Sequence, residues 1–124
     1  MPRRESPRAP DLVGLRSEYL AALGALHAAT QLVHQALDDA AAALVIVRDH
    51  IEHEGMVSDL DEYISPTQLR ESLSTSINDL ERVRHHAQRL LFRLLHAEGM
   101  TMSDIGRTWG VSRQLVSRFI NEAQ

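Results

Sequence analysis

Residues 23–51 read LGALHAATQLVHQALDDAAAALVIVRDHI, and this stretch decides the fold that the sequence predicts. Its apolar positions are separated alternately by three and four residues, which is the heptad spacing of a helix packed along its length. These positions are Leu23, Leu26, Thr30, Val33, Leu37, Ala40, Leu44, Val47 and Ile51. Beside them, a second series repeats every seven residues at Ala22, Ala29, Ala36 and Ala43. Together the two series predict a long helix with a wide apolar stripe, suited to contact with more than one other helix.

A second long helix is predicted after an acidic loop, which spans residues 55–66 and reads GMVSDLDEYISP. Ser65, Pro66 and Gln68 provide an N-cap, a proline at the first helical position and a capping-box partner at the third. Apolar residues then continue at steps of four and three as far as Leu94, and Gly99 is placed to end the helix. The loop is long enough for the two helices to fold back on each other as an antiparallel hairpin.

A hairpin of two helices leaves much of its apolar surface in water, and association of two chains into a four-helix bundle would cover that surface. We therefore expect an all-α protein that forms a homodimer through a long antiparallel helical hairpin at residues 11–98. Asp11 is placed to cap the first helix. Residues 1–10, MPRRESPRAP, are rich in proline and arginine and are predicted to form a flexible basic arm.

The composition of the 124-residue chain restricts where it works and what it binds. There is no cysteine, which excludes disulfides and thiolate metal sites. The longest apolar runs, such as residues 40–47, fall short of the roughly 20 residues that span a bilayer. The first residues also do not lead into the apolar segment of a secretory signal. We expect a soluble cytoplasmic protein without a membrane association.

The net charge of −4 is distributed very unevenly along the chain. Residues 9–81 carry three arginines against thirteen acids, whereas residues 82–124 carry seven arginines against three acids. Binding of a polyanion depends on the local potential, so the last third of the chain can bind one although the whole chain is acidic.

Residues 99–124 are predicted to form a separate module of two short helices around a glycine turn. Thr101 is placed to cap the first helix, Gly110 permits a left-handed turn, and Ser112 is placed to cap the second helix. Small Gly106 would allow a neighbouring helix to approach closely. The side chains expected to face inward are Ile105, Trp109, Val111, Leu115, Val116, Phe119 and Ile120.

Residues 110–121, GVSRQLVSRFIN, together with Gly106 and Ile105, resemble the helix-turn-helix of LacI-type transcriptional repressors. Residues 94–112, LLHAEGMTMSDIGRTWGVS, also resemble region 4 of bacterial sigma factors. The resemblance covers about a fifth of the chain. LacI-type repressors place this motif first and follow it with a sugar-binding domain, whereas here it comes last, so their inducer chemistry is not carried over.

The resemblance implies that the second helix of the module lies in the major groove of DNA. Arg113, Gln114 and Arg118 match base-reading positions of the family's motif. Arginine can bind guanine with two hydrogen bonds, and glutamine can bind adenine in the same way. Phosphate contacts are expected from Ser103, Arg107, Ser112, Ser117 and Asn121. The alternative is a polar helix face that is simply solvated.

Basic residues recur on the second long helix at Arg82, His86, Arg89, Arg93 and His96. They would lie on its outer face, where they either extend a DNA footprint or form ion pairs, and ion pairs are favoured because Arg82 is expected near Asp38 and Asp39. The seven histidines are expected to be solvated or ion-paired rather than metal ligands, so no metal and no other cofactor is predicted. No phosphate-binding loop or activated nucleophile is recognisable, and we expect no enzymatic activity.

The sequence therefore predicts a transcriptional regulator of the bacterial nucleoid, a homodimer that binds double-stranded DNA sequence-specifically. Two alternatives remain open. In one, the acidic hairpin is a protein-interaction or sensory module that binds a protein of the transcription machinery, and the terminal motif serves only for packing. In the other, the protein coats the chromosome without sequence preference.

Overall fold

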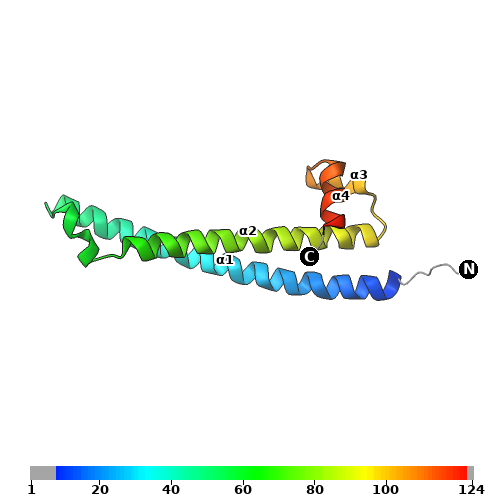
Figure 1. Cartoon of the computed structure of the whole chain (residues 1–124), viewed down its shortest axis with the longest axis horizontal. Coiled ribbons are helices and arrows are strands. Elements are labelled where there is room, and N and C mark those ends of the chain that lie inside the picture. Colours follow the sequence, from blue (N-terminus) through cyan, green and yellow to red (C-terminus); the bar gives the residue numbers. More distant parts are fainter. Residues whose placement is uncertain (1–7, 123–124) are drawn as a thin grey trace, which may run out of the picture. The chain divides into compact units, whose positions relative to one another are not determined.

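The computed structural model describes residues 8–122, with side chains from residue 12 onward, and this part of the chain consists of helices joined by short turns. Its elements are α1 (Arg8–Glu52), the short 3-10 helix η1 (Val57–Glu62), α2 (Pro66–Ala97), α3 (Met102–Trp109) and α4 (Arg113–Asn121) (Figure 1). No strand occurs among the described residues. The expected all-α class is confirmed.

The start of α1 differs from the prediction. The helix begins at Arg8, so Asp11 lies inside it instead of preceding it as an N-cap. Of the flexible arm predicted over residues 1–10, residues 1–7 lie outside the part that the structure describes. None of the described helices is both long enough and apolar enough to cross a bilayer.

The chain divides into two compact units, each of which contains part of both long helices. We call residues 27–82 the middle unit. The terminal unit consists of the chain up to residue 26 together with the chain from residue 83 onward, and it includes α3 and α4.

In the middle unit, the second part of α1 and the first part of α2 are joined by η1. Among residues 27–82, all of which the structure describes, the fully buried side chains are Ala29, Ala36 and Ala43. Leu37 and Leu44 of the larger apolar series remain exposed. Val33, Ala40 and Val47 of the same series are half-buried, so the expected seam is packed only in part within the single chain. The face of α1 that is buried most completely in this unit therefore carries short alanine side chains.

An open hollow of about 340 Å³ adjoins the same two helix segments. It is lined by Asp39, Ala42, Ala43, Ile46, Ile64, Ser65, Gln68, Leu69 and Ser72.

The predicted start and end of α2 are both set by local hydrogen bonds of the backbone. Ser65 Oγ accepts a hydrogen bond from the Gln68 N–H at 3.4 Å, and α2 begins at Pro66 as expected. At the other end of α2, Gly99 adopts a positive φ of 109° and its N–H donates to the His96 carbonyl at 3.0 Å. The predicted cap glycine is confirmed there.

The end of α1 is built differently, because the left-handed residue is Glu54, with φ 63°, and the glycine follows it. The Gly55 N–H donates to the His50 carbonyl at 2.8 Å and the Glu54 N–H donates to the Ile51 carbonyl at 3.0 Å, which is a Schellman cap. The His50 ring covers Gly55, and its Nε2 donates to the Met56 carbonyl at 2.7 Å. His50 therefore has a structural role at this turn.

The terminal unit contains two apolar clusters. One joins Ala22 of α1 to Ala87 and Leu90 of α2, with Leu15, Tyr19 and Leu26 around them. The other lies where α3 and α4 pack against the last turns of α2, as Figure 1 shows. This second cluster fixes the position of the candidate site.

Replacing Glu54 by glycine is expected to stabilise the chain by about 0.5–1 kcal/mol, because glycine adopts the left-handed conformation without steric strain. The matched control is Glu52→Gly in the last helical position of α1, where glycine is expected to destabilise by a similar amount. Denaturant unfolding of both variants measures the two free energies. Destabilisation by Glu54→Gly would contradict the assigned cap.

Candidate nucleic-acid interface

The turn between α3 and α4 is held by backbone hydrogen bonds and two side-chain caps. Thr101 Oγ1 accepts from the Asp104 N–H at 3.0 Å and Ser112 Oγ accepts from the Leu115 N–H at 3.0 Å. Between the helices, Gly110 is left-handed, with φ 71° and ψ 31°. Both predicted caps and the predicted turn glycine are confirmed.

Gly106 is required where the chain that leads into α4 crosses over α3. The Val111 N–H donates to the Gly106 carbonyl at 2.9 Å. A methyl group added to Gly106 would lie 2.7 Å from the Val111 carbonyl oxygen, which is closer than a carbon and an oxygen can approach. The backbone on both sides would have to move to admit a side chain.

The core beneath this turn is centred on Phe92 of α2. Phe92, Ile105 and Val116 are completely buried, and Phe119 completes the cluster with its ring centroid 5.7 Å from that of Phe92. Phe92 lies off the heptad positions of α2, so the sequence pattern gave no reason to place it in a core. The sequence signal that could have indicated its burial is an aromatic side chain at a position outside the apolar seam of α2.

Trp109 is a correction to the sequence prediction, because its side chain is 47% exposed instead of facing inward. Ile105 occupies the centre of the core one turn earlier, and the Trp109 ring reaches only the edge, with its centroid 6.5 Å from that of Phe92. As the only tryptophan in the chain, it is a natural fluorescent probe of the α3–α4 module.

The C-terminal end of α4 is anchored on α2 by an arginine. Arg93 Nε donates to the Ile120 carbonyl at 3.0 Å, and the same guanidinium donates to the Glu122 carbonyl. The last carbonyls of a helix lack partners within the helix and carry partial negative charge, so a cation is favoured there. Arg93 therefore fixes the orientation of α4.

The Glu122 carboxylate joins the same cluster. Its Oε1 lies 3.0 Å from His85 Nε2 and 3.7 Å from an Arg89 guanidinium nitrogen. The hydrogen bond from His85 lowers the pKa of Glu122 below its ordinary value; partial burial opposes this, while the charges of His85, Arg89 and Arg118 add to it.

Two of the five basic residues predicted for an outer face of α2 are placed differently by the structure, and a third, Arg82, is exposed but has another partner than expected. Arg89 is almost fully buried and Arg93 is half-buried, and both contact the end of α4. The ion pair of Arg82 is with Asp79 of its own helix at 2.5 Å instead of with Asp38 or Asp39. Arg89 and Arg93 are thus engaged by the protein itself.

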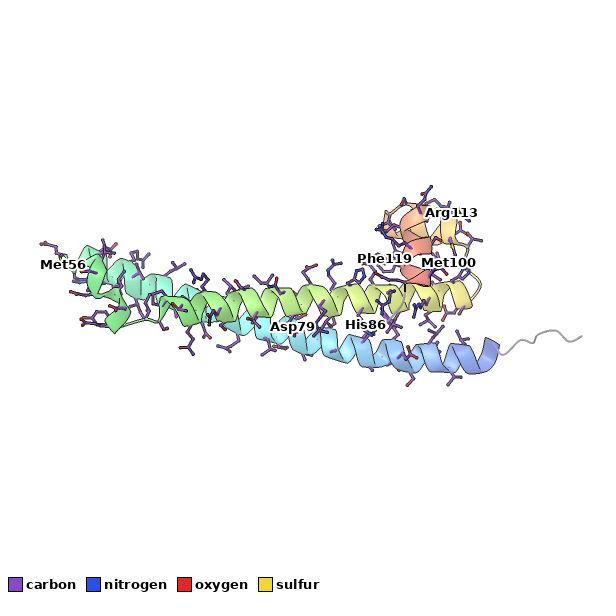
Figure 2. All side chains as sticks on the ribbon, in the orientation of Figure 1. Met56, Asp79, His86, Met100, Arg113 and Phe119 are labelled. Atoms are coloured by element: carbon purple, nitrogen blue, oxygen red, sulfur yellow. The ribbon has the colours of Figure 1, made fainter. Side chains whose placement is uncertain are left out.

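The structure brings the predicted DNA-contacting residues together on α3, α4 and the turn between them. Arg113 and Gln114 are exposed in the first turn of α4, and Figure 2 shows Arg113 at the end of the module that points away from α2. Ser103, Arg107, Ser112, Arg118 and Asn121 are also exposed, and Ser117 is half-buried.

Several of these residues already have partners within the chain. Arg107 pairs with Asp104, and Asn121 Nδ2 donates to the Ser117 carbonyl at 2.9 Å. The Ser112 hydroxyl accepts a hydrogen bond as the cap of α4, but its own proton can still be donated. Within residues 12–122, no hydrogen bond or ion pair holds the side chain of Arg113 or Gln114.

Comparison of the chain with protein-family models, curated proteins and solved structures found no match. Across residues 8–122, no group of three or more histidine and acidic side chains is placed to hold a metal ion.

Gly106→Ala is expected to destabilise the α3–α4 module by roughly 1–3 kcal/mol, because the added methyl group clashes with backbone. The matched control is Gly24→Ala in α1, where nothing lies within 4 Å of the added methyl group and a gain of about 0.5–1 kcal/mol is expected. Denaturant unfolding followed by Trp109 fluorescence measures the loss. Equal stability of the two variants would contradict the close approach.

Docking of the end of α4 is expected to weaken in acid. Because the pKa of Glu122 is lowered in the folded chain, the carboxylate stabilises the fold above its ordinary pKa of 4.5, and this contribution is lost as the pH falls through the folded value. Glu122→Gln should therefore be less stable than the parent at neutral pH and equally stable once the parent's carboxyl is protonated.

Unfolding free energies measured over a pH series, with Trp109 fluorescence as the probe, test this expectation. Glu71→Gln, which removes the same charge from α2 within the middle unit, is the control. A constant difference between Glu122→Gln and the parent at every pH would show that the carboxylate does not act through its charge.

Proposed function

We propose that the chain is a sequence-specific DNA-binding protein that regulates transcription, with α4 as the helix that enters the major groove. The observation that carries this proposal is the exposed first turn of α4, where the side chains of Arg113 and Gln114 have no partner within residues 12–122. Long donor side chains at the start of a second helix are what reading of base edges requires.

The support around α4 suits this role because recognition needs side chains that are held in position. Ser112 caps the start of the helix, Arg93 holds its end, and Val116 is completely buried against the core. A helix fixed at both ends loses little further freedom on binding. Gln114 and Arg118 are four residues apart and share one face of α4.

The remaining polar side chains would contact phosphates. Ser103 and Ser112 lie in the first turn of α3 and at the cap of α4, where free backbone N–H groups also favour an anion. Ser117 and Asn121 follow along α4. Arg107 would exchange its partner Asp104 for a phosphate oxygen.

A single motif of this size makes few contacts, so the proposal includes a homodimer formed through the helical hairpin. Two copies of α4 would then read half-sites about 34–36 Å apart, or a multiple of that distance, on a two-fold-related operator. The proposed place of action is the bacterial nucleoid.

A second candidate function is protein interaction through the hairpin, and one observation favours it. Met56, Val57 and Tyr63 are exposed at the turn between α1 and α2, among the acidic residues of η1. An acidic and apolar surface suits a basic protein partner. In that case, Arg113→Ala and Arg118→Ala would leave the cellular activity unchanged.

Selection of bound duplexes from a random pool, at a stated salt concentration, tests the proposal. A defined motif is expected, and binding should weaken steeply with salt because phosphate contacts release counterions. Enrichment of no motif, despite tight binding, would favour a protein that coats the chromosome without sequence preference.

Single substitutions are expected to separate base contacts from phosphate contacts. Arg113→Ala and Gln114→Ala should each relax the choice of base at one position, a loss of about 1–3 kcal/mol of discrimination. Arg107→Ala should weaken binding to all sequences alike and reduce the salt slope by about one. Repeated selection and titration measure both effects, and Arg70→Ala in α2 is the control.

The results for the three variants of α4 together decide whether this helix reads bases. If Arg113→Ala, Gln114→Ala and Arg118→Ala all select the same motif as the parent with unchanged preference, α4 does not read bases.

A further inference from the structure

The middle unit does not contain a hydrophobic core of ordinary size. Among residues 27–82, all of them described, only Ala29, Ala36 and Ala43 are fully buried, and the buried residues of α2 begin at Val83. A methyl group removes little apolar surface from water, and small scaffolds with such cores need additional support. The middle unit of a single chain is therefore incomplete.

The apolar side chains that a core would use are present in this unit but face water. Leu37, Leu44 and Ile51, each seven residues apart on α1, are 52%, 69% and 44% exposed. Half-buried Val33, Ala40 and Val47 alternate with them at steps of three and four. We call these six residues the outer seam of α1. Leu37, Leu44 and Ile51 lie about 100° around the helix from the buried alanine series, whereas Val33, Ala40 and Val47 lie about 40° from it and are partly covered within the single chain.

Charge distribution distinguishes the outer seam from the rest of the middle unit. Residues 27–82 carry three arginines against eleven acids, yet no position of the outer seam is charged. Asp38, Asp39 and Asp49 lie on other faces of α1. A charge-free apolar seam inside an acidic segment suits an apolar helix of the same repeat and excludes DNA as its occupant.

We propose that the outer seam is covered by the middle unit of a second copy of this chain. Two-fold pairing brings the same seam from each copy together, and this isologous arrangement is the commonest in soluble oligomers. From Val33 to Ile51 the seam is roughly 27 Å long. An interface that includes α1 and the α2 segment beside it, each helix about 10 Å across, covers roughly 540 Å² on each copy and roughly 1,100 Å² in total, above the about 1,000 Å² of a specific interface.

This inference rests on the homodimer of the proposed function and locates its interface, but it concerns pairing alone and can be tested without DNA.

Leu37→Ala combined with Leu44→Ala removes apolar volume from the outer seam. Alanine favours helices and both positions are exposed in the single chain, so the variant is not expected to unfold the monomer. The matched control is Val45→Ala, at a residue 48% exposed and about 100° away on α1.

Sedimentation equilibrium of the full chain, with helicity followed by circular dichroism, measures the result. The parent is expected to be a dimer at micromolar concentrations. The double variant should raise the dissociation constant at least about 100-fold, whereas Val45→Ala should change it less than about threefold.

A monomeric parent, or a double variant that pairs as tightly as the parent, would overturn the inference, as would an equal effect of Val45→Ala. A parent that is dimeric through the outer seam but binds no DNA would leave this inference in place and overturn the proposed function. Selective DNA binding by a monomeric parent would overturn this inference and leave the proposed DNA binding in place.

Discussion

The burial of Phe92 is the contact on which the arrangement of the terminal unit depends. Its ring lies completely buried between Ile105 of α3 and Val116 and Phe119 of α4, and it belongs to α2. Removal of a buried phenylalanine ring destabilises a protein by about 3–5 kcal/mol. The next residue, Arg93, holds the carbonyls at the end of α4. Two neighbouring residues of α2 thus join both short helices to the long one through different chemistry.

This anchoring divides the arginines of the terminal unit into two groups. Arg89 and Arg93 are engaged at the end of α4 and stabilise the fold, whereas Arg113 remains exposed at its start. The proposed reading of DNA therefore depends on position along one nine-residue helix and not on the total positive charge. The folded chain also pairs Arg107 with Asp104, which leaves the excess positive charge of the module on α4.

Most features that depend on a few consecutive residues were predicted correctly from the sequence, as the caps at Thr101 and Ser112 and the turn at Gly110 show, although the cap expected at Asp11 was not. Features that depend on which helix faces meet were not. The two apolar series of α1 have the same seven-residue repeat, so periodicity cannot decide whether the alanines or the leucines contact α2. The exposure of Trp109 and the burial of Phe92 likewise depend on which faces of α2, α3 and α4 meet.

The two units differ in the side chains that each buries. This difference bears on how the proposed pairing and the proposed DNA binding use separate surfaces. The terminal unit buries large side chains such as Phe92 and Leu90, so it has a core of its own. The middle unit buries only alanines and is strongly acidic. An acidic surface repels a polyanion but leaves a charge-free apolar seam open to a protein. Pairing through residues 27–82 and DNA contact through α4 would then not compete for the same surface. In the proposed dimer, association would contribute most to the folding of the unit that lacks a core, so the stability of that unit should depend on protein concentration.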